Sequence, residues 1–415
     1  MAHTDAIVLG AGIVGVATAL HLAKRGLAVA LIDRRGPGEE TSYGNTGIIE
    51  GNTLFPPAFP RGFSRLLDIA LKRAPDANYH LGFLPKIAPW LLSYRAATQP
   101  EQLAESARLV RPLFRRAVAE HEALMAEADA GHLTRKTGWL KLYRRDSSFA
   151  ATAREREIAA HFGIPIRVLD PEGARTLEPS LNPVFRHALN MEGATSISDP
   201  LALTRAYAKR FSALGGLVLT GDARALHRAG ARWRLDTAEG PVDAENAVVA
   251  LGPWSPDVLG SLGIKLPMAV KRGYHRHFRP QGNASLVRPV LDADNGYCIT
   301  PMSQGIRLTT GAEFADRDAA PTPVQFNLVE PRARELFALG EPVEAQPWLG
   351  ARPCFADSRP VIGPAPGQAG LWLAFGHAHW GLTLSAITGR LVADLVAKTA
   401  PVVDPAPYAA ERFKR

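Results

Sequence analysis

Three glycines near the N-terminus are spaced as in a turn that holds phosphates. Gly10, Gly12 and Gly15 form a G-x-G-x-x-G motif, and Asp33 follows the last glycine by 18 residues. The first glycine permits a tight turn, the second lets the backbone approach a pyrophosphate, and the third lets a helix pack closely on a strand. Asp33 can accept hydrogen bonds from both hydroxyls of an adenosine ribose, so the pattern indicates a dinucleotide site.

The elements around this motif are those that a dinucleotide site requires. Residues Asp5–Leu9 form a short apolar run that predicts a buried strand, and Ala28–Ile32 predicts a second strand that ends at Asp33. Between them, apolar residues recur at helical spacing, and the helix N-terminus supplies N–H donors and a partial positive charge. The unit alone leaves NAD and FAD open, although Asp33 would repel the 2′-phosphate that Arg34 and Arg35 suggest.

A polar loop rich in glycine, TSYGNTGII, follows at Thr41–Ile49. A simple βαβ unit would continue with a helix at this point. Small side chains and glycines allow the backbone to contact a large flat cofactor, whereas a surface turn is the alternative on composition alone.

Histidines and cysteines give no pattern typical of a metal site. Two H-x-H pairs occur, but neither is accompanied by a third carboxylate or cysteine ligand: His275 with His277, and His377 with His379. Cys298 and Cys354 are 56 positions apart and form no C-x-x-C unit. We therefore expect no metal, no disulfide scaffold and two small buried thiols.

Composition limits the class of protein. The chain has 415 residues, of which 46% are hydrophobic and 21% charged, as in a globular protein with two domains. The net charge of +8 comes from basic residues scattered along the whole length, which does not favour a nucleic-acid binder. Such an excess suits solubility, an acidic small substrate or weak attraction to anionic lipid. No segment has the pattern of a transmembrane helix or a signal peptide, so we expect a cytoplasmic protein that can also associate peripherally with the inner face of the cell membrane.

The loop at Thr41–Ile49 resembles the S-x-x-N-A-G loop of the D-amino acid oxidase superfamily of FAD-dependent oxidoreductases. Thr46 stands where that family usually has alanine. Four later stretches resemble the same family in the same order, and their matching residues are Gly252, Trp254 and Ser255; Tyr297, Gly311 and Glu313; Arg352, Pro353, Asp357 and Gly363; and Gly376, His377, Gly381 and Gly389. The resemblance covers the whole chain, and the segment Gly51–Leu92 is most similar to the D-amino acid dehydrogenase branch.

The resemblance implies an α/β fold, with a Rossmann-like FAD-binding domain and a second, α+β substrate-binding domain built on an antiparallel sheet. Residues 1–60, 193–265 and 345–415 are expected to form the discontinuous FAD-binding domain, and residues 61–192 and 266–344 the substrate-binding domain. Hydrophobic patterning independently predicts strands at Leu214–Leu219, Trp233–Thr237, Asn246–Leu251 and Leu371–Phe375, and helices at Gln99–Ala130 and Thr383–Ala397.

The cofactor that the resemblance implies is FAD, bound without a covalent link, because Cys354 does not match the spacing of relatives that attach the flavin. The loop Gly376–Thr383 precedes a helix, so its N–H groups can face the flavin pyrimidine ring and stabilise the negative charge that develops there on reduction. The expected cofactor contacts are Gly10, Gly12, Ile13, Val14, Gly15, Asp33, Arg34, Ser42, Asn45, Thr46, Gly47, Gly252, Trp254, Arg352, Gly376, His377, Gly381, Leu382 and Thr383.

A single G-x-G-x-x-G unit indicates that electrons come directly from an organic substrate rather than from a nicotinamide. By resemblance, that substrate is an amine whose Cα–H passes as hydride to flavin N5, giving an imine that water hydrolyses. Arg352 would grip a substrate carboxylate with its planar fork, and Tyr297 would add a hydroxyl donor. Lys271 and His275 are candidates for tuning reactivity with oxygen. The alternatives are an ion pair of Arg352 with Asp357 and a core position for Tyr297.

The leading interpretation is an FAD-dependent dehydrogenase of a D-amino acid or cyclic imino acid that passes electrons to a quinone or another carrier. The runner-up is an oxidase, similar to glycine or sarcosine oxidase, that uses oxygen and releases hydrogen peroxide. A dinucleotide-binding protein without redox turnover and an RNA-modifying flavoprotein are alternatives from other classes. The sequence does not determine the side chain of the substrate, the electron acceptor or the oligomeric state.

Overall fold

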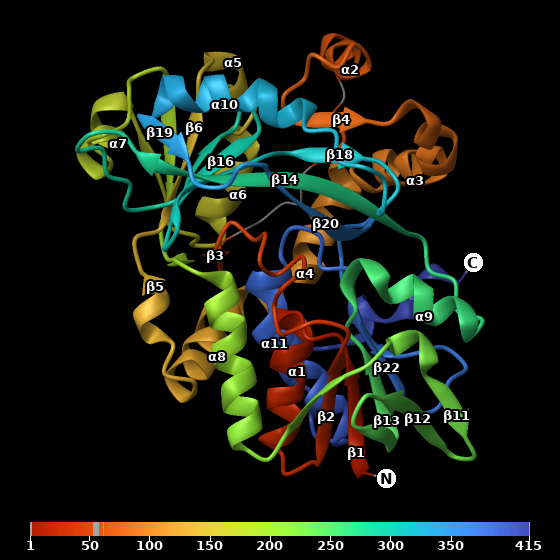
Figure 1. The fold of residues 1–415 in the computed structure, drawn as a ribbon. Helices are drawn as coiled ribbons and strands as arrows, with labels where there is room; N and C mark the ends of the chain where they lie inside the picture. Colours follow the sequence, from red (N-terminus) through yellow and green to blue (C-terminus); the bar gives the residue numbers. More distant parts are fainter. Residues whose placement is uncertain (1, 53–57, 61, 415) are drawn as a thin grey trace.

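Two large β-sheets, one above the other, make up the core of the molecule (Figure 1). The computed structural model describes residues 2–52, 58–60 and 62–414. The segment Gly51–Leu92 is thus described except for residues 53–57 and 61. A third, small sheet consists of β3 (Ile48–Ile49), β9 (Thr195–Ile197) and β5 (Thr134–Arg135).

The first sheet, drawn at the bottom of Figure 1, contains the glycine turn. Its parallel strands are β10 (Leu217–Thr220), β2 (Val29–Asp33), β1 (Ala2–Leu9), β13 (Gly240–Val249) and β22 (Leu371–Phe375). Strands β11 (His227–Ala229), β12 (Arg232–Thr237) and β21 (Val361–Pro364) add antiparallel pairs. The sequence predicted strands at β1, β2, β10, β12, β13 and β22, and the structure confirms each of them, β22 with the predicted ends and the others with shifted ends.

Helices cover both faces of this sheet. Helices α1 (Ile13–Ala23), α4 (Pro100–Glu127), α8 (Pro200–Ala213) and α11 (Gly381–Val396) share one apolar core with β1 and β2. Gly389 lets α11 cross α1 closely, because a Cβ at this position would lie 2.6 Å from the carbonyl carbon of Ala17. The short helix α9 (Ser255–Ser261) packs on the opposite face with the side chains of β12 and β13.

The second sheet is largely antiparallel and is organised around the long strand β14 (Met268–Pro280). This strand pairs with β17 (Gly305–Thr309), β18 (Ala312–Phe314), β19 (Leu339–Pro342) and β20 (Trp348–Phe355). The sheet continues through β16 (Tyr297–Met302), β15 (Val290–Asp292), β6 (Trp139–Tyr143) and β8 (His187–Met191) to β7 (Ile166–Leu169), and β4 (Ala77–Tyr79) pairs with β18. Helix α10 (Val324–Leu336) packs on this sheet and shares a hydrophobic core with it.

Shorter helices complete the chain. They are α2 (Phe63–Ala70), α3 (Leu84–Ala97), α5 (Asp146–Ala150), α6 (Ala153–His161) and α7 (Pro171–Leu177), with 3₁₀ turns η1 (Leu81–Phe83), η2 (Gly131–Leu133), η3 (Ala223–Ala225), η4 (Gly252–Trp254), η5 (Ala406–Tyr408) and η6 (Ala410–Phe413). Throughout the described ranges, no helix combines the length and the hydrophobicity needed to cross a bilayer.

The structure differs from the expected domain division at two places. Helix α4 lies within the segment 61–192, but its buried side chains, including Phe114 and Leu124, pack in the same core as α1 and α11. Strand β20 lies within the segment 345–415, but it pairs along its whole length with β14 of the second sheet. Both differences arise because an amphipathic helix or a strand reveals which face is apolar, but not which core receives it.

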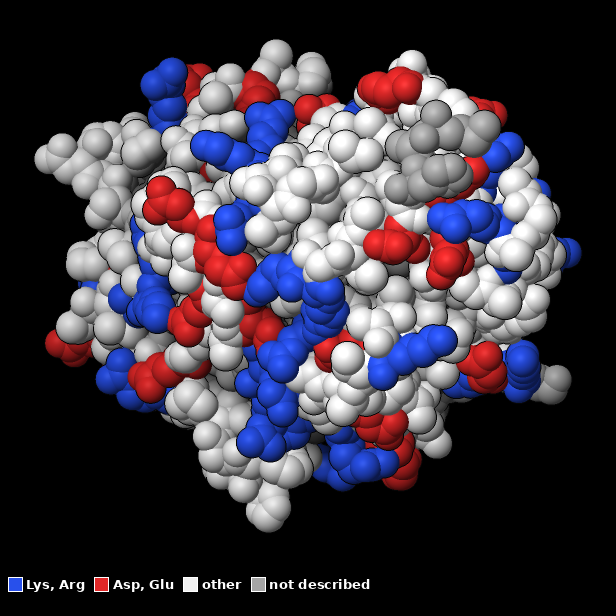
Figure 2. Space-filling view, turned by 90° about the horizontal axis from the view of Figure 1, so that it is seen from below, with Lys and Arg blue, Asp and Glu red and all other residues white. Residues whose placement is uncertain are grey.

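Charges of both signs share the surface of the lower end of the molecule. Figure 2 shows basic side chains in a band across this face, with acidic side chains beside them. Ion pairs of this kind also occur at the cavity end of the first sheet, in the contacts of Arg34 with Glu40 and of Arg224 with Asp222. The scattered arginines of the sequence thus lie among acidic side chains on this face.

Candidate active site

A cavity of about 440 Å³ lies between the two sheets. Its lining begins at the carboxyl ends of β1, β2 and β13, where ligands bind in open α/β sheets. It ends against β14 and β20 of the second sheet. The first sheet thus forms one end of the cavity, and the second sheet forms the other.

The glycine turn at the lower end of the cavity has no room for side chains. Gly10 has a φ of +101°, and a Cβ there would lie 2.6 Å from the carbonyl oxygen of Ala250. A Cβ on Gly15 would lie 1.8 Å from the carbonyl oxygen of Gly10, so this glycine lets α1 approach β1. Gly12 lines the cavity, as do Ile13 and Val14 at the start of α1.

Asp33 ends β2 at the cavity wall and is held by backbone donors. Its two carboxylate oxygens accept hydrogen bonds from the N–H of Ala11 at 2.6 Å and of Arg35 at 3.0 Å. The guanidinium of Arg34 lies 4.8 Å from the ring centre of Trp254, and both residues line the cavity with Gly252. These residues surround the space expected for an adenosine.

The loop after β2 is fastened to the second sheet by an arginine that the sequence did not single out. Arg307 on β17 donates hydrogen bonds to the carbonyls of Tyr43, at 2.8 Å, and Asn45, at 2.5 Å. Its Nε also lies 3.0 Å from Nε2 of His277, which in turn contacts Glu344. No motif marks Arg307, because its role depends on a contact between distant parts of the chain.

Within the same loop, only some of the expected residues reach the cavity. Ser42 and Asn45 line it, and the hydroxyl of Ser42 accepts a hydrogen bond of 2.9 Å from the N–H of Ile13. Thr46 and Gly47 are outside the lining. Gly47, with a φ of +72°, instead packs against the carbonyl of Ile197, which a Cβ would approach to 2.4 Å.

The N-terminus of α11 faces the cavity with its backbone donors uncapped. Its N-cap residue, Trp380, forms no side-chain cap, so the first N–H groups of the helix have no side-chain acceptor. Gly381 and Leu382 line the cavity, whereas the hydroxyl of Thr383 donates to the carbonyl of Ile48 at 3.0 Å. An anionic or polarised ring atom placed here would meet the positive end of the helix dipole.

The loop before α11 also contributes to the lining. His377 is in it, bonded through Nε2 to the hydroxyl of Thr388 at 2.9 Å, and burial lowers the pKa of His377 to about 3. Gly376 lies outside the lining, with its α-carbon against Phe355. His379, which the sequence analysis considered only as part of an H-x-H pair, also lines the cavity, and its side chain is exposed.

Arg352 lies on β20 at the upper end of the cavity without an acidic partner among the described residues. Its guanidinium rests on the backbone of Gly273 and donates to the carbonyls of Gly311, at 3.0 Å, and Thr310, at 3.3 Å. Asp357, the alternative partner considered from the sequence, pairs instead with Arg359 and Arg412. The charge of Arg352 is therefore solvated by dipoles but not neutralised.

His275 lines the cavity beside this arginine. It is 1% exposed, its ring stacks on Trp348 with centroids 4.8 Å apart, and neither ring nitrogen has a hydrogen-bond partner among the described residues. Burial, followed by the charges of Arg307, His277 and Arg352, holds the pKa of His275 well below its ordinary value. The imidazole is therefore neutral at neutral pH and can both donate and accept a hydrogen bond. Trp348, which no sequence motif marked, forms the wall next to it.

Lys271 is the register partner of Arg352 on the adjacent strand β14. Its side chain is 6% exposed and lies just behind the cavity lining, with the ammonium 4.0 Å from the ring centre of Tyr94. Burial lowers the pKa of Lys271, and the nearby charge of Arg352 lowers it further, while Cys354 acts in the opposite direction.

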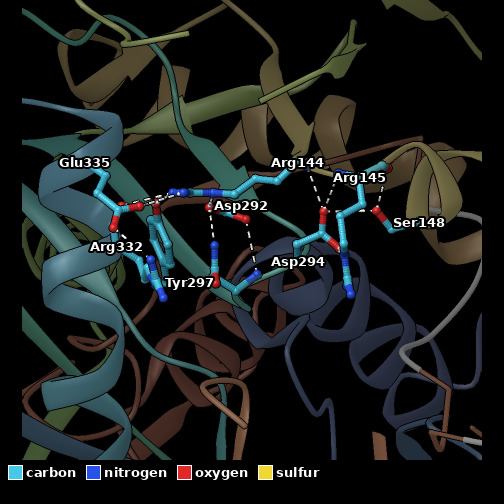
Figure 3. A network of polar contacts seen from close by, with 9 residues as sticks. Arg144, Arg145, Ser148, Asp292, Asp294, Tyr297, Arg332 and Glu335 are labelled. Carbon is cyan, nitrogen blue, oxygen red and sulfur yellow. Dashed lines mark hydrogen bonds and ion pairs between the residues drawn. The ribbon is translucent and has the colours of Figure 1, made fainter. Parts of the chain in front are cut away.

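The structure places Tyr297 away from the cavity, contrary to the expectation that it faces the substrate. Figure 3 shows Tyr297 within a network of polar contacts, where its hydroxyl donates to the carbonyl of Arg332 at 3.1 Å and lies 3.5 Å from Nη2 of Arg144. The ring is 1% exposed and belongs to the core under α10. The alternative considered from the sequence, a core position for Tyr297, is therefore correct. Strand β17 lies between β16, which carries Tyr297, and β14, which lines the cavity.

Neither cysteine nor any metal cluster contributes to this site. Cys298 and Cys354 are free, buried and outside the lining. In the described part of the chain, no group of three or more His, Cys, Asp and Glu side chains could hold a metal ion.

The residues present fit FAD. At Gly10 a Cβ would clash with the backbone of Ala250, and Gly12 brings a backbone without a side chain to the cavity wall. Asp33 stands at the ribose position, and the uncapped end of α11 faces the cavity. When bound, FAD would accept a hydride from a substrate placed between its ring and Arg352.

Comparisons with known proteins agree with this architecture. A family model described as DAO, FAD dependent oxidoreductase, matches residues 5–395. The chain is 33% identical over 422 residues to a D-amino acid dehydrogenase of Rhizobium johnstonii, covering 98% of this chain and 99% of that one. It is 29% identical over 414 residues to a D-amino-acid oxidase of Bradyrhizobium diazoefficiens, covering 98% of each. Glycine oxidase from Geobacillus kaustophilus has a similar fold, with a TM-score of 0.76 and 24% identity over 100% of both chains. The chain therefore belongs to the DAO family of FAD-dependent oxidoreductases.

Proposed function

We propose that this protein is an FAD-dependent dehydrogenase that oxidises a D-amino acid or cyclic imino acid and passes the electrons to a quinone or another carrier. The observation that carries the proposal is Arg352, a cation without an acidic partner among the described residues, at the end of the cavity opposite the glycine turn. A buried cation of this kind needs an anion, and the α-carboxylate of an amino acid supplies one. Relatives named D-amino acid dehydrogenase support the choice of substrate.

The residues around the cavity would position the substrate rather than react with it. Arg352 would bind the carboxylate with two parallel N–H donors, which fixes both position and orientation. His275, neutral and without a partner, can bond to the amine or to its departing proton, and Trp348 stacked on it excludes water from that side. The N–H groups of α11 would stabilise negative charge on the cofactor ring.

Anaerobic reduction of the bound flavin tests the substrate class directly. A series of D-amino acids, their L-enantiomers and the matched D-amino amides would be mixed with the yellow holoenzyme. We expect bleaching by D-amino acids and not by the amides, because the amides lack the carboxylate that Arg352 binds. Equal bleaching by an amino acid and its amide would contradict the assignment.

The acceptor is a separate question, because the relatives include both a dehydrogenase and an oxidase. Stopped-flow reoxidation of the reduced enzyme would compare air-saturated buffer with a soluble quinone analogue. We expect the quinone to react faster. Rapid reoxidation in air with one hydrogen peroxide formed per flavin would instead establish the oxidase.

A lipid surface is the partner that the exposed helix α2 fits, and we propose peripheral association through it. No residue of α2 is buried, and Phe63, Leu67 and Leu71 lie along one side with exposed fractions of 82%, 45% and 50%. Arg65 of the same helix pairs with Asp76. The exposed cations Lys72 and Arg73 follow the helix, so an apolar strip lies beside positive charge, as in proteins that bind anionic lipid.

Flotation with vesicles tests this surface. We expect the holoenzyme to bind vesicles of phosphatidylcholine with 30% phosphatidylglycerol, and to bind pure phosphatidylcholine less. The double variant Phe63→Ser, Leu67→Ser should lose binding, whereas Leu214→Ser, at a leucine that is 38% exposed elsewhere, should keep it. Binding that is unchanged in the double variant would exclude α2 as the contact.

A further inference from the structure

Two cationic side chains stand next to each other at the upper end of the cavity. Lys271 of β14 and Arg352 of β20 are directly opposite in the antiparallel register, so their side chains leave the sheet on the same face. Gly273 and His275, two and four residues after Lys271, line the cavity and thus identify this face as the cavity face. Like charges at such positions repel each other unless an anion lies between them.

No acidic side chain in the described part of the chain provides that anion. The acidic residues that line the cavity lie at its other end, and most of them pair with arginines. The pairs are Glu40 with Arg34, Asp222 with Arg224, and Asp257 with Arg317. Asp318 also pairs with Arg317, and Asp33 is held by backbone N–H groups. The two cations at the upper end therefore have no counter-charge of their own.

Lys271 is surrounded by aromatic rings, which only partly compensate for its burial. Its ammonium lies 4.0 Å from the ring centre of Tyr94, 5.2 Å from Trp90 and 5.8 Å from Phe314. These rings favour a cation but offer no hydrogen-bond acceptor, and within the described ranges the ammonium of Lys271 has neither a hydrogen bond nor an ion pair. Removing an ammonium from water costs more than ring contacts alone return.

We propose that the substrate carries a second anionic group, and that Lys271 binds it while Arg352 holds the α-carboxylate. The substrate class is then an α-amino acid with a carboxylate in its side chain, such as aspartate or glutamate. The inference rests on the proposed function for the α-carboxylate and adds the second contact. Lys271 would reach the anion through a flexible side chain that ends in three N–H donors, with the rings of Trp90 and Tyr94 packed around its ammonium.

Each acidic amino acid has a matched neutral control of the same size, its side-chain amide. In the holoenzyme, we expect kcat/KM for D-aspartate or D-glutamate to exceed that for D-asparagine or D-glutamine by about tenfold or more, as for a charged contact in an enclosed site. The L-enantiomers would be measured in parallel. An amide that is oxidised as efficiently as its acid would overturn the inference.

Variants at Lys271 assign the preference to this side chain. The ratio of kcat/KM for the acid to that for the amide should fall by about tenfold in Lys271→Met and recover in part in Lys271→Arg. Lys265→Met, which removes an exposed lysine shortly before β14, should leave the ratio unchanged. If Lys271→Met lowered the efficiency with acid and amide by the same factor, Lys271 would act on the cofactor or on oxygen, and the inference would be wrong.

Equilibrium binding separates this inference from the proposed function. Calorimetry on the holoenzyme would compare malonate, succinate and glutarate with acetate, propionate and butyrate. Tighter binding of one dicarboxylate, weakened both in Lys271→Met and in Arg352→Ala, supports the cation pair even if no amino acid is turned over. Equal binding of mono- and dicarboxylates would overturn the second contact alone, whereas no binding of either series would overturn the carboxylate site itself.

Discussion

In the proposed function, Arg352 is the residue that positions the substrate. It occupies a cavity wall, it is held by the carbonyls of Gly311 and Thr310, and among the described residues it has no acidic partner. The same wall carries His275, whose ring nitrogens are free to bond to a ligand. Among the described residues, Arg352 lacks a counter-charge and His275 lacks hydrogen-bond partners. A bound substrate would supply both, and this is the physical reason to place it between them.

Arg352→Ala should therefore abolish efficient turnover without releasing the cofactor. Losing a bidentate charged contact costs about 2–5 kcal/mol in transition-state binding. We expect kcat/KM to fall accordingly, with unchanged flavin absorbance per protein, and Arg352→Lys to recover only part because an ammonium cannot form two parallel bonds. A near-normal kcat/KM in the alanine variant would refute the clamp.

The pH profile should lack a limb from His275 near neutrality. The pKa of His275 lies well below its ordinary value because of burial and of the charges of Arg307, His277 and Arg352, so the imidazole stays neutral throughout the assay range. The reactive substrate is the neutral amine, so kcat/KM should rise with pH from 6 toward the pKa of the amine. A profile measured from pH 5.5 to 10 checks this. A limb near pH 6.5 that disappears in His275→Gln would contradict it.

The element that we propose to hold the cofactor is the turn from β1 into α1, which β17 supports from outside. The turn supplies a backbone without side chains at Gly10 and Gly12, and Arg307 of β17 holds the adjoining loop by two carbonyls. The helix α11 contributes uncapped N–H groups from the other end of the chain. Three elements distant in sequence thus form one binding surface.

Gly15→Ala should impair FAD binding by separating α1 from β1. The new Cβ would lie 1.8 Å from the carbonyl oxygen of Gly10, so the helix must move. Overpacking of this kind costs about 1–3 kcal/mol, which corresponds to about 5-fold to 150-fold weaker retention of FAD. The FAD released by acid precipitation would be measured per protein, which also tests the absence of a covalent link.

The control for this substitution is Gly260→Ala in α9, where nothing lies within 4 Å of the added Cβ. It should keep its FAD. Equal FAD contents in the two variants would show that the close approach at Gly15 is not required, and flavin that stays with the precipitated chain would show a covalent link.

At the scale of the whole molecule, several histidines are buried in the cores that join the two sheets to their helices. His21, His121 and His377 are 5%, 0% and 3% exposed. Burial lowers their pKa values to about 3, about 4 and about 3 respectively, with charges of neighbouring cations adding to the shift at His21. Each must be neutral in the folded protein, whereas each binds a proton near pH 6.5 in the unfolded chain.

Stability should therefore fall as the pH drops below about 6.5. The unfolded state then binds more protons than the folded state, so the free energy of unfolding decreases by about 1.4 kcal/mol per group and pH unit. The three histidines together account for about 4 kcal/mol between pH 7.5 and 5.5. Urea unfolding at both pH values measures the change, and His121→Gln should reduce it by about a third. A free energy of unfolding that is the same at both pH values would contradict the assignment.

The sequence by itself determined the local parts of the site. The spacing of Gly10, Gly12 and Gly15, the strands β1 and β2, and Asp33 at the end of β2 could be predicted because each depends on neighbours within about thirty residues. Turns, helices and strand ends each favour particular residue types at particular spacings, so the sequence indicates them directly. The arginine at position 352 was found by its motif, and its position at the cavity is as expected.

Only the tertiary structure decided which distant side chains meet. Tyr297 points into the core under α10, Lys271 stands opposite Arg352, and Arg307 holds the cofactor loop. None of these follows from sequence spacing, because a shift of one residue in strand register turns every side chain to the other face of the sheet. Register is fixed by pairing between strands that are far apart along the chain, so the direction of these side chains emerges only when the two sheets are assembled.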